Sequence, residues 1–354
     1  MSRYLSPRLS SLVPYTPGEQ PRERRYIKLN TNESPFPPSP RALSEARLAA
    51  ERCALYPDPT MKALREAIAE TLGVAPECVL PTNGSDEILS YAFCAFCDAA
   101  TPAVFPDITY GFYSVFATLY GVPYRQVPLR EDFTVDPADY AAAGGTVFIA
   151  NPNAPTGLAL PLSAIEAIVA ANPQNVVVVD EAYVDFGAES AVALTKKYDN
   201  LLVTQTFSKS RSMAGARLGF GIGSPALIRD LDTVKYSQNP YNVNAMSAAM
   251  GIGALSDAAT FRQNCESIKE NRAYTEAALG ELGFLVLPSL TNFVFARHPR
   301  LSGEAFYTAL RERGILVRHF TAPRIADYNR ITVGSREDME ALVAAASAIL
   351  EETK

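Results

Sequence analysis

Thr206-Phe207-Ser208-Lys209-Ser210 is the stretch around which the chain is organised. It follows the apolar run Leu201-Leu202-Val203, which predicts a buried strand, and it precedes a segment at 213–219 that contains glycines and an arginine. Lysine is rarely buried without a role, and a cation is disfavoured at the start of a helix. A lysine that is desolvated beside other cations has a lowered pKa and becomes an amine nucleophile. The setting therefore predicts that Lys209 reacts with a carbonyl group.

Pyridoxal 5′-phosphate carries such a carbonyl as its aldehyde, and its site needs three further features. These are an acid for the pyridine nitrogen, a hydrogen-bond partner for the phenolic oxygen, and a phosphate cradle of helix-start amides and an arginine. Four valines at 176–179 predict a central parallel strand that is covered on both faces, and Asp180 follows them at its carboxyl end. Asp180 is the candidate acid, with a helix N-cap as the alternative. Tyr183 can reach the same pocket.

Two segments are candidates for the phosphate cradle. Asn83-Gly84-Ser85-Asp86 predicts a helix start with free amides, although the same residues also fit a helix that is merely well capped. Arg217 can supply the guanidinium and Ser208 a hydroxyl. Tyr110 follows the predicted strand 102–105, where its ring could stack on a pyridine or simply be buried in the core.

The composition is typical of a soluble globular enzyme. The chain has 354 residues, 48% hydrophobic and 20% charged, which predicts about two domains. The net charge of −6 argues against nucleic acid or an anionic membrane as a partner. No run approaches the roughly 18 apolar residues of a membrane span, and the first residues lack the apolar core of a signal peptide. Together with five cysteines, these features lead us to expect a cytoplasmic protein.

Three other patterns are assigned to structure rather than to chemistry. Cys94-Ala95-Phe96-Cys97 lies in an apolar helical stretch without a second pair, so we expect buried thiols rather than a redox or metal site. The two histidines, His298 and His319, form no metal-ligand cluster, and we expect no metal. Glycines at 219–223 resemble half of a dinucleotide fingerprint, but they are better explained as close-packed strand glycines, which argues against a nicotinamide-dependent dehydrogenase.

The order of predicted elements divides the chain into an arm and two domains. Residues 1–40 are an arm, 41–245 a large α/β domain with a mostly parallel sheet, and 246–354 a smaller α+β domain. The large domain is predicted to contain helices 41–51, 61–72, 85–99, 109–120 and 161–171 and strands 102–105, 124–128, 146–150, 175–180 and 201–205.

Long helical periodicity at 242–281 links the two domains. The smaller domain is predicted to contain strands 283–287, 292–296, 315–318 and 329–333 and helices 302–313 and 335–352.

Four motifs together resemble the fold-type I pyridoxal-phosphate-dependent aminotransferases. They are Asp180-Glu181-Ala182-Tyr183, Thr206-Phe207-Ser208-Lys209, Gly215-Ala216-Arg217-Leu218-Gly219 and Asn151-Pro152-Asn153-Ala154-Pro155-Thr156-Gly157. The resemblance is closest to the histidinol-phosphate aminotransferase family and covers nearly the whole chain in the right order. Supporting segments lie at 29–36, 56–58, 83–87, 240–244, 314–318 and 330–334.

The resemblance implies further site residues and a partner. Arg330 and Arg318 match arginines that grip the acidic group of a substrate. The arm packs over the active site in this family, with Tyr15 in contact with the substrate. Tyr56 reaches the cofactor phosphate of a neighbouring subunit, which implies a homodimer. Asn32 lies in an extended, proline-flanked loop and is a fair place for a substrate contact.

The sequence departs from the family pattern at Ala154. An asparagine normally stands there, before the second proline, and hydrogen-bonds the phenolic oxygen of the cofactor. In this chain the oxygen is left to Tyr183, with help from Asn153 or a water molecule. The loss of one such hydrogen bond costs about 1 kcal/mol, which would not abolish the chemistry.

The resemblance implies transamination between histidinol phosphate and imidazole acetol phosphate, with glutamate and 2-oxoglutarate as the second pair. Lys209 is the expected base for the Cα proton. Two enzymes of the same fold remain as alternatives, an aromatic amino-acid aminotransferase and a threonine-phosphate decarboxylase. A third alternative is a non-catalytic, cofactor-binding regulatory domain, which the set of Lys209, Asp180 and Tyr183 argues against.

Overall fold

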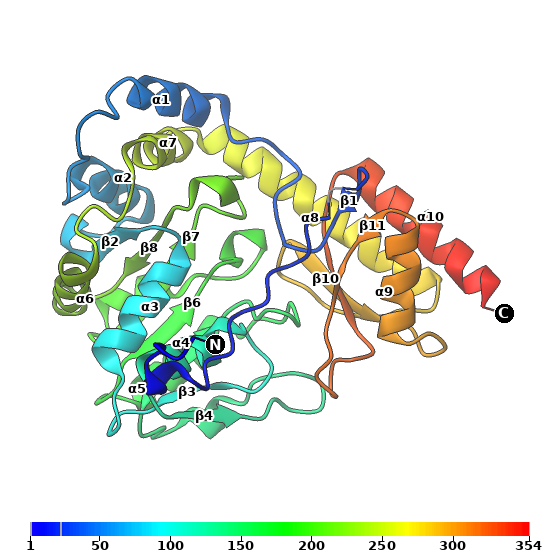
Figure 1. The fold of residues 1–354 in the computed structure, drawn as a ribbon, viewed down its shortest axis with the longest axis horizontal. Helices are drawn as coiled ribbons and strands as arrows, with labels where there is room; N and C mark the ends of the chain where they lie inside the picture. Colours follow the sequence, from blue (N-terminus) through cyan, green and yellow to red (C-terminus); the bar gives the residue numbers. More distant parts are fainter. Residues whose placement is uncertain (1, 22, 354) are drawn as a thin grey trace.

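The computed structural model describes residues 2–21 and 23–353, and a seven-stranded sheet forms the centre of its larger part (Figure 1). The strand order is β2-β8-β7-β6-β5-β3-β4. β8 runs antiparallel to β7 and β2, whereas the neighbouring pairs from β7 to β4 are parallel. The strands are β2 (Val79–Thr82), β3 (Ala103–Pro106), β4 (Tyr124–Val127), β5 (Thr146–Ala150), β6 (Val177–Asp180), β7 (Leu201–Thr206) and β8 (Gly219–Ile222).

Helices cover both faces of this sheet, which explains the run of valines in β6. Val178 packs into one core with side chains of α3, α4 and α6, and Val177 and Val179 face a second core with α2, α5 and α7. Helices α1 and α7 pack along each other at the edge of the second core (Figure 1). The helices are α1 (Pro40–Ala50), α2 (Lys62–Leu72), α3 (Ser85–Phe96), α4 (Phe112–Tyr120), α5 (Leu162–Ala171), α6 (Pro225–Gln238) and α7 (Ala245–Leu255).

A smaller unit carries an antiparallel four-stranded sheet, ordered β12-β13-β10-β9. Its apolar face packs with α8, α9 and α10 into a separate core. The elements are α8 (Ala258–Glu281), β9 (Leu285–Leu287), β10 (Phe293–Arg297), α9 (Gly303–Glu312), β11 (Ile315–Leu316), β12 (Arg318–His319), β13 (Asn329–Thr332) and α10 (Arg336–Glu352). Short 3₁₀ turns lie at Pro7–Leu9, Pro76–Cys78, Pro137–Tyr140, Val184–Phe186, Ala191–Lys196 and Ala214–Ala216.

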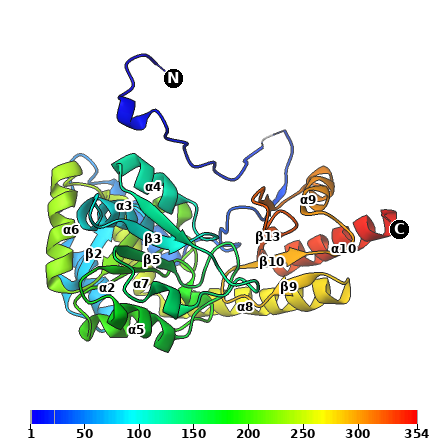
Figure 2. The same cartoon turned by 90° about the horizontal axis from the view of Figure 1, so that it is seen from below.

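The N-terminal segment joins the two units. β1 (Ile27–Lys28) pairs in parallel with β11 of the smaller unit. From β1 the preceding chain extends across to α4 of the larger unit (Figure 2), where Arg8 donates a hydrogen bond to the carbonyl of Leu119 at 3.2 Å. The arm therefore spans the junction between the two units.

Most predicted elements are present, with three informative differences. Strand 146–150 has the predicted bounds, but α3 ends at Phe96 because Cys97 is already extended, and α4 begins only at Phe112. The predicted strand 315–318 is two short strands that join different sheets. Cys97 is buried as expected, whereas Cys94 is exposed, so the prediction of buried thiols was wrong for Cys94. Cys94 lies in the last turn of α3, on the side of the helix that faces solvent.

The division into domains at residue 245 stays a prediction. α7 packs against α1 and α2, and α8 continues from it into the smaller unit. None of the helices in the described residues is long and apolar enough to cross a lipid bilayer.

Candidate active site

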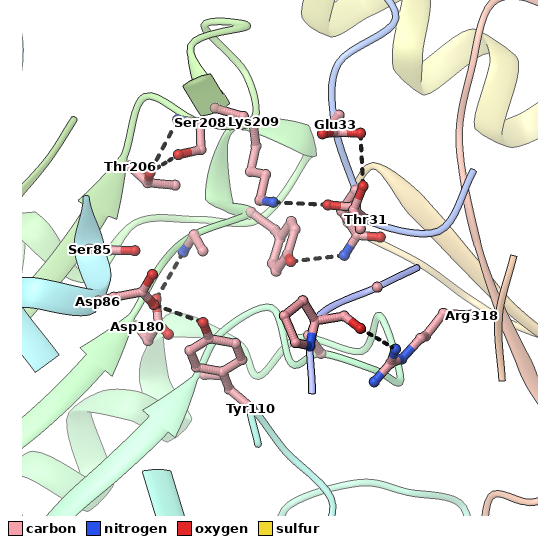
Figure 3. A pocket seen from close by; sticks show the side chains of 18 of the residues that line it. Thr31, Glu33, Ser85, Asp86, Tyr110, Asp180, Thr206, Ser208, Lys209 and Arg318 are labelled. Carbon is pink, nitrogen blue, oxygen red and sulfur yellow. Dashed lines mark hydrogen bonds between the residues drawn. The ribbon is translucent and has the colours of Figure 1, made fainter. Parts of the chain in front are cut away.

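A cavity of about 390 Å³ lies between the carboxyl edge of the large sheet, the start of α3 and the smaller unit (Figure 3). Parallel strands bring their carboxyl ends to one edge, so side chains distant in sequence meet there. Twelve of the residues singled out from the sequence line this cavity: Tyr15, Asn32, Ser85, Asp86, Tyr110, Asp180, Tyr183, Ser208, Lys209, Arg217, Arg318 and Arg330.

Lys209 follows the end of β7 and points its amine into the cavity (Figure 3). Its Nζ donates a hydrogen bond to the carbonyl oxygen of Thr31 at 3.3 Å and lies 5.8 Å from the ring centre of Tyr183. Burial, assisted by the positive charge of Arg330, lowers the pKa of Lys209 to about 8. A substantial fraction of the amine is therefore neutral near physiological pH, as a nucleophile or base requires.

Asp180 is the last residue of β6 and is buried. Its Oδ2 accepts a hydrogen bond from the hydroxyl of Tyr113 at 3.2 Å, and its Oδ1 accepts one from the backbone N–H of Ala182 at 3.3 Å. Burial, followed by the negative charge of Asp86, raises the pKa of Asp180 to about 7. Sequence reasoning missed Tyr113, which lies in the first turn of α4, with its ring edge-on to that of Tyr110 and the ring centres 5.8 Å apart.

The start of α3 and Arg217 lie side by side at one end of the cavity. Gly84 precedes the helix with φ of +82°, and a Cβ at this position would come within 2.7 Å of Nη2 of Arg217. Only glycine suits both the backbone conformation and the close approach. Nη2 of Arg217 lies 3.1 Å from Oδ2 of Asp86, and Ser208 accepts a hydrogen bond from Thr206 at 2.9 Å. Guanidinium, helix amides and hydroxyls are thus concentrated at this end.

Two aromatic rings stand beside these groups. The hydroxyl of Tyr110 donates to Oδ1 of Asp86 at 2.7 Å, and burial raises the pKa of Tyr110 (Figure 3). Tyr15, from the arm, stacks on Phe112 with ring centres 4.5 Å apart and lies 6.4 Å from Tyr110. The arm thus carries an aromatic side chain to the rim of the cavity.

The smaller unit contributes two arginines. Arg330 donates from Nη2 to the carbonyl oxygen of Asn30 at 3.2 Å, and its Nε finds no partner among the residues that the structure describes. Burial lowers the pKa of Arg330. Arg318 donates to the backbone carbonyls of Pro17 at 3.2 Å and Thr16 at 3.1 Å, so it also holds the arm in place. These arginines give the cavity two cations opposite the large sheet.

The chain matches a known protein family over most of its length. Residues 24–345 match the model described as aminotransferase class I and II. The chain belongs to this family. Histidinol-phosphate aminotransferase 1 of Bradyrhizobium diazoefficiens is 52% identical to this aminotransferase over 343 residues, which is 97% of this chain and 98% of that protein.

Other comparisons agree with this assignment. The histidinol-phosphate aminotransferase of Aromatoleum aromaticum is 50% identical over 356 residues, covering 99% of this chain and all of that protein. The solved histidinol-phosphate aminotransferase of Sinorhizobium meliloti, in complex with pyridoxal-5′-phosphate, superposes with a TM-score of 0.91. It is 24% identical and covers 100% of this chain and 99% of its own. That likeness shows the fold and confirms the predicted fold class of a mostly parallel α/β domain with a smaller α+β unit.

Three residues that the sequence singled out do not line the cavity. Gly84 is the N-cap of α3 and lies against the guanidinium of Arg217. Asn153 is buried, but its amide donates to the carbonyl of Ile108 at 3.0 Å and its Oδ1 accepts from Thr109 at 2.8 Å, so it supports the surrounding turn. Tyr56 is 81% exposed and stacks on Tyr241 with ring centres 4.5 Å apart.

Sequence reasoning also left out residues that the structure brings to the cavity. Thr31 and Glu33 belong to a motif quoted for the family resemblance, yet no role was assigned to them. Glu33 forms an ion pair with Lys28 and accepts a hydrogen bond from Thr31. Thr206, the last residue of β7, lines the cavity three residues before Lys209. Their position in the sequence could have revealed these three residues, because each lies within three residues of a predicted site residue.

The residues of this aminotransferase fit pyridoxal 5′-phosphate. An amine of lowered pKa suits the aldehyde, and a buried carboxylate suits a protonated pyridine nitrogen. The start of α3 beside Arg217 suits a phosphate, and a Cβ at Gly84 would disturb that arrangement. The ring of Tyr110 lines the same cavity, and its hydroxyl is hydrogen-bonded to Asp86. Each part of the cofactor therefore has a matching group in one cavity.

Proposed function

We propose that the chain is a pyridoxal-phosphate-dependent aminotransferase that interconverts histidinol phosphate and imidazole acetol phosphate, with glutamate and 2-oxoglutarate as the second pair. The observation that carries the proposal is the meeting of Lys209, Asp180 and the pair Arg318 and Arg330 in one cavity. Relatives about 50% identical over nearly the whole chain support the choice of substrates.

The cofactor would be held by residues from both ends of the cavity. We assign the phosphate to Arg217, Ser208 and the amides of Ser85 and Asp86. Tyr110 is the ring's stacking partner. When bound, pyridoxal 5′-phosphate supplies an aldehyde that takes up the substrate's amino group and a ring that withdraws electrons from its Cα.

Three side chains would then act on protons. Lys209 Nζ removes the proton from the substrate's Cα, which its lowered pKa favours because the amine is partly neutral at physiological pH. Asp180 is the anion that keeps a proton on the ring nitrogen, and Tyr113 holds its carboxylate in place at 3.2 Å. Tyr183 offers a hydroxyl to the phenolic oxygen.

Substrate recognition is assigned to the arginines and the arm. Both substrate pairs carry an anion, a phosphate on one and a side-chain carboxylate on the other. A guanidinium binds either group with parallel hydrogen bonds, so Arg330 and Arg318 could serve both substrates. Tyr15 and Asn32 complete the rim and wall of the substrate space.

A panel of acceptors with glutamate as donor tests the proposal. We expect kcat/KM for imidazole acetol phosphate to exceed that for phenylpyruvate on the order of 100-fold, because only the former offers a phosphate for Arg318 and Arg330. Carbon dioxide release from threonine phosphate should be absent. Preference for phenylpyruvate would favour the aromatic aminotransferase, and carbon dioxide release the decarboxylase. Absence of visible absorbance after incubation with the cofactor would contradict all three.

We also propose a cytoplasmic homodimer in which Tyr56 reaches the partner's cofactor. The exposed Tyr56–Tyr241 stack supports this, since exposed aromatic clusters are typical of interfaces. Light scattering should give twice the chain mass. Mixing Tyr56→Ala with Lys209→Ala subunits should recover activity in the mixed dimer, because one of its two sites carries neither change; no recovery would contradict the shared site.

A further inference from the structure

A closed set of hydrogen bonds links the smaller unit to Tyr183. The backbone N–H of Asn32 donates to Oγ1 of Thr332 at 2.9 Å. The hydroxyl of Thr332 donates to Oδ1 of Asn32 at 3.1 Å, and Nδ2 of Asn32 donates to the hydroxyl oxygen of Tyr183 at 2.9 Å. Asn32 and Thr332 are 1% and 2% exposed, so water does not compete for these bonds.

The direction of each bond follows from the chemistry of the groups. A backbone N–H and an amide NH₂ can only donate, whereas a hydroxyl can do both. Thr332 accepts from the backbone of Asn32, so its single proton is free to be donated to Oδ1. That bond fixes the amide of Asn32 with Oδ1 toward Thr332 and Nδ2 toward Tyr183. The Tyr183 oxygen therefore accepts from Asn32 and must donate its own proton elsewhere.

The remaining direction for that proton is the cavity. Tyr183 lines the cavity, and no other hydrogen bond to its hydroxyl is present among the described residues. Ala154 lines the same cavity and its methyl group can donate nothing. The Tyr183 hydroxyl is thus a donor that has no acceptor within the described chain.

The backbone holds Asn32 firmly in this role. Its φ of +55° lies in the left-handed region, where asparagine is one of the few tolerated side chains. Its carbonyl oxygen accepts from Nδ2 of Asn292 at 3.0 Å, and Thr332 donates its backbone N–H to the carbonyl of Leu29. These bonds hold the backbone of Asn32 in place, so the orientation of its amide is set by the bonds to Thr332 and Tyr183.

We propose that Thr332 and Asn32 are positioning residues that fix the direction of the Tyr183 proton, so that it is donated to the phenolic oxygen of the bound cofactor. The identity of that acceptor rests on the proposed function. Thr332 belongs to β13 in the smaller unit and is not among the residues that line the cavity, and both hydrogen bonds of its side chain within the described residues are to Asn32, through which it acts. Removing its hydroxyl lets the amide turn over, and an inverted amide presents an acceptor that draws the Tyr183 proton away.

The pH midpoint of the visible absorbance of the cofactor-loaded protein measures this effect. A donor to the phenolic oxygen favours its ionised form, so loss of the donor raises the midpoint. We expect Thr332→Val, which keeps the side-chain shape, to raise the midpoint by roughly half to one pH unit. Thr332→Ser keeps the hydroxyl and should retain the wild-type midpoint. Thr275→Val removes another buried threonine hydroxyl, in α8, and should leave the midpoint unchanged.

The same substitutions in a Tyr183→Phe protein separate an effect on the Tyr183 proton from a general structural effect. In Tyr183→Phe protein there is no proton to direct, so Thr332→Val should produce no further shift. Asn32→Asp, which tolerates the left-handed backbone, provides an independent variant should Thr332→Val fail to fold. Its added charge would shift the midpoint in both backgrounds, whereas the lost donor would add a shift only where Tyr183 is present.

The outcomes are distinguishable. The proposal is overturned by an unchanged midpoint in Thr332→Val, by an equal shift in Thr275→Val, or by equal shifts with and without Tyr183. If Thr332→Val does not fold, equal shifts of Asn32→Asp in the two backgrounds overturn it as well. A wild-type protein that takes up no cofactor would instead contradict the proposed function, and this inference with it.

Discussion

Asp180→Asn is predicted to stabilise the protein when it is prepared without cofactor. Burial and the charge of Asp86 raise the pKa of Asp180 from 3.8 to about 7. The folded protein therefore binds a proton at Asp180 between about pH 4 and pH 7 that the unfolded chain has released. The free energy of unfolding falls as the pH rises through this window, because the carboxylate must ionise inside the fold.

The size of the effect follows from the shift. About three pKa units correspond to about 4 kcal/mol of destabilisation above pH 7, and almost none below pH 4, where both states are protonated. Asparagine has the same shape, can still accept from Tyr113, and never ionises. The difference in the free energy of unfolding between Asp180→Asn and wild type should therefore grow by about 2 to 3 kcal/mol between pH 5 and pH 8.

Urea unfolding at pH 5, 6, 7 and 8 measures this difference. Burial also raises the pKa of Glu181 to about 7, but that residue is present in both proteins and its effect cancels. In the same samples, Asp180→Asn should bind pyridoxal 5′-phosphate more weakly and lose most of kcat, because a neutral amide cannot hold a proton on the ring nitrogen. A stability difference that stays constant across this pH range would refute the reasoning.

Three further substitutions probe other parts of the site. Lys209→Ala should abolish transamination with the fold intact by circular dichroism; retention of most of the rate would reassign the base. Arg330→Ala should raise KM for glutamate and for the phosphorylated substrate about 100-fold each, because each substrate loses a buried charged partner. An effect on only one KM would limit the role of Arg330 to that substrate. Gly84→Ala should weaken the binding of pyridoxal 5′-phosphate about tenfold, because backbone strain at positive φ and displacement of Arg217 cost on the order of 1 to 2 kcal/mol. A titration with the cofactor measures this, and unchanged binding would contradict the assigned phosphate cradle.

Local sequence patterns predicted the large sheet well because burial on both faces leaves a strong signal. The valines before Asp180 and the apolar run before Thr206 could only fit central strands. The segments that were missed lack this signal. β2 contains Pro81. α6 is buried on one face only, at Leu227, Ile228 and Leu231, and sequence reasoning overlooked this stripe. Their place depends on the antiparallel partner β8 and on packing, which sequence spacing does not encode.

The candidate site was predictable to the extent that its residues end strands or begin helices. Lys209, Asp180 and Arg217 could be placed at one sheet edge from topology alone. Arg318 could not be placed as a support for the arm, because its bonds are to backbone carbonyls some 300 residues away in the chain. Asn153 looked like a pocket residue from its motif, yet its amide donates to the carbonyl of Ile108 and to the hydroxyl of Thr156.

The charges that line the cavity explain why such a site is costly to fold and gains from its ligands. The lining has more cationic than anionic side chains. Of the anions, Asp86 and Glu33 already form ion pairs with Arg217 and Lys28, and burial raises the pKa of Asp180. Burial, followed by the positive charge of Arg330, lowers the pKa of Lys209. Anionic ligands would offset this excess, so phosphate and carboxylate groups should stabilise the fold as they bind. The charged residues of the lining are Glu33, Asp86, Asp180, Lys209, Arg217, Arg318 and Arg330.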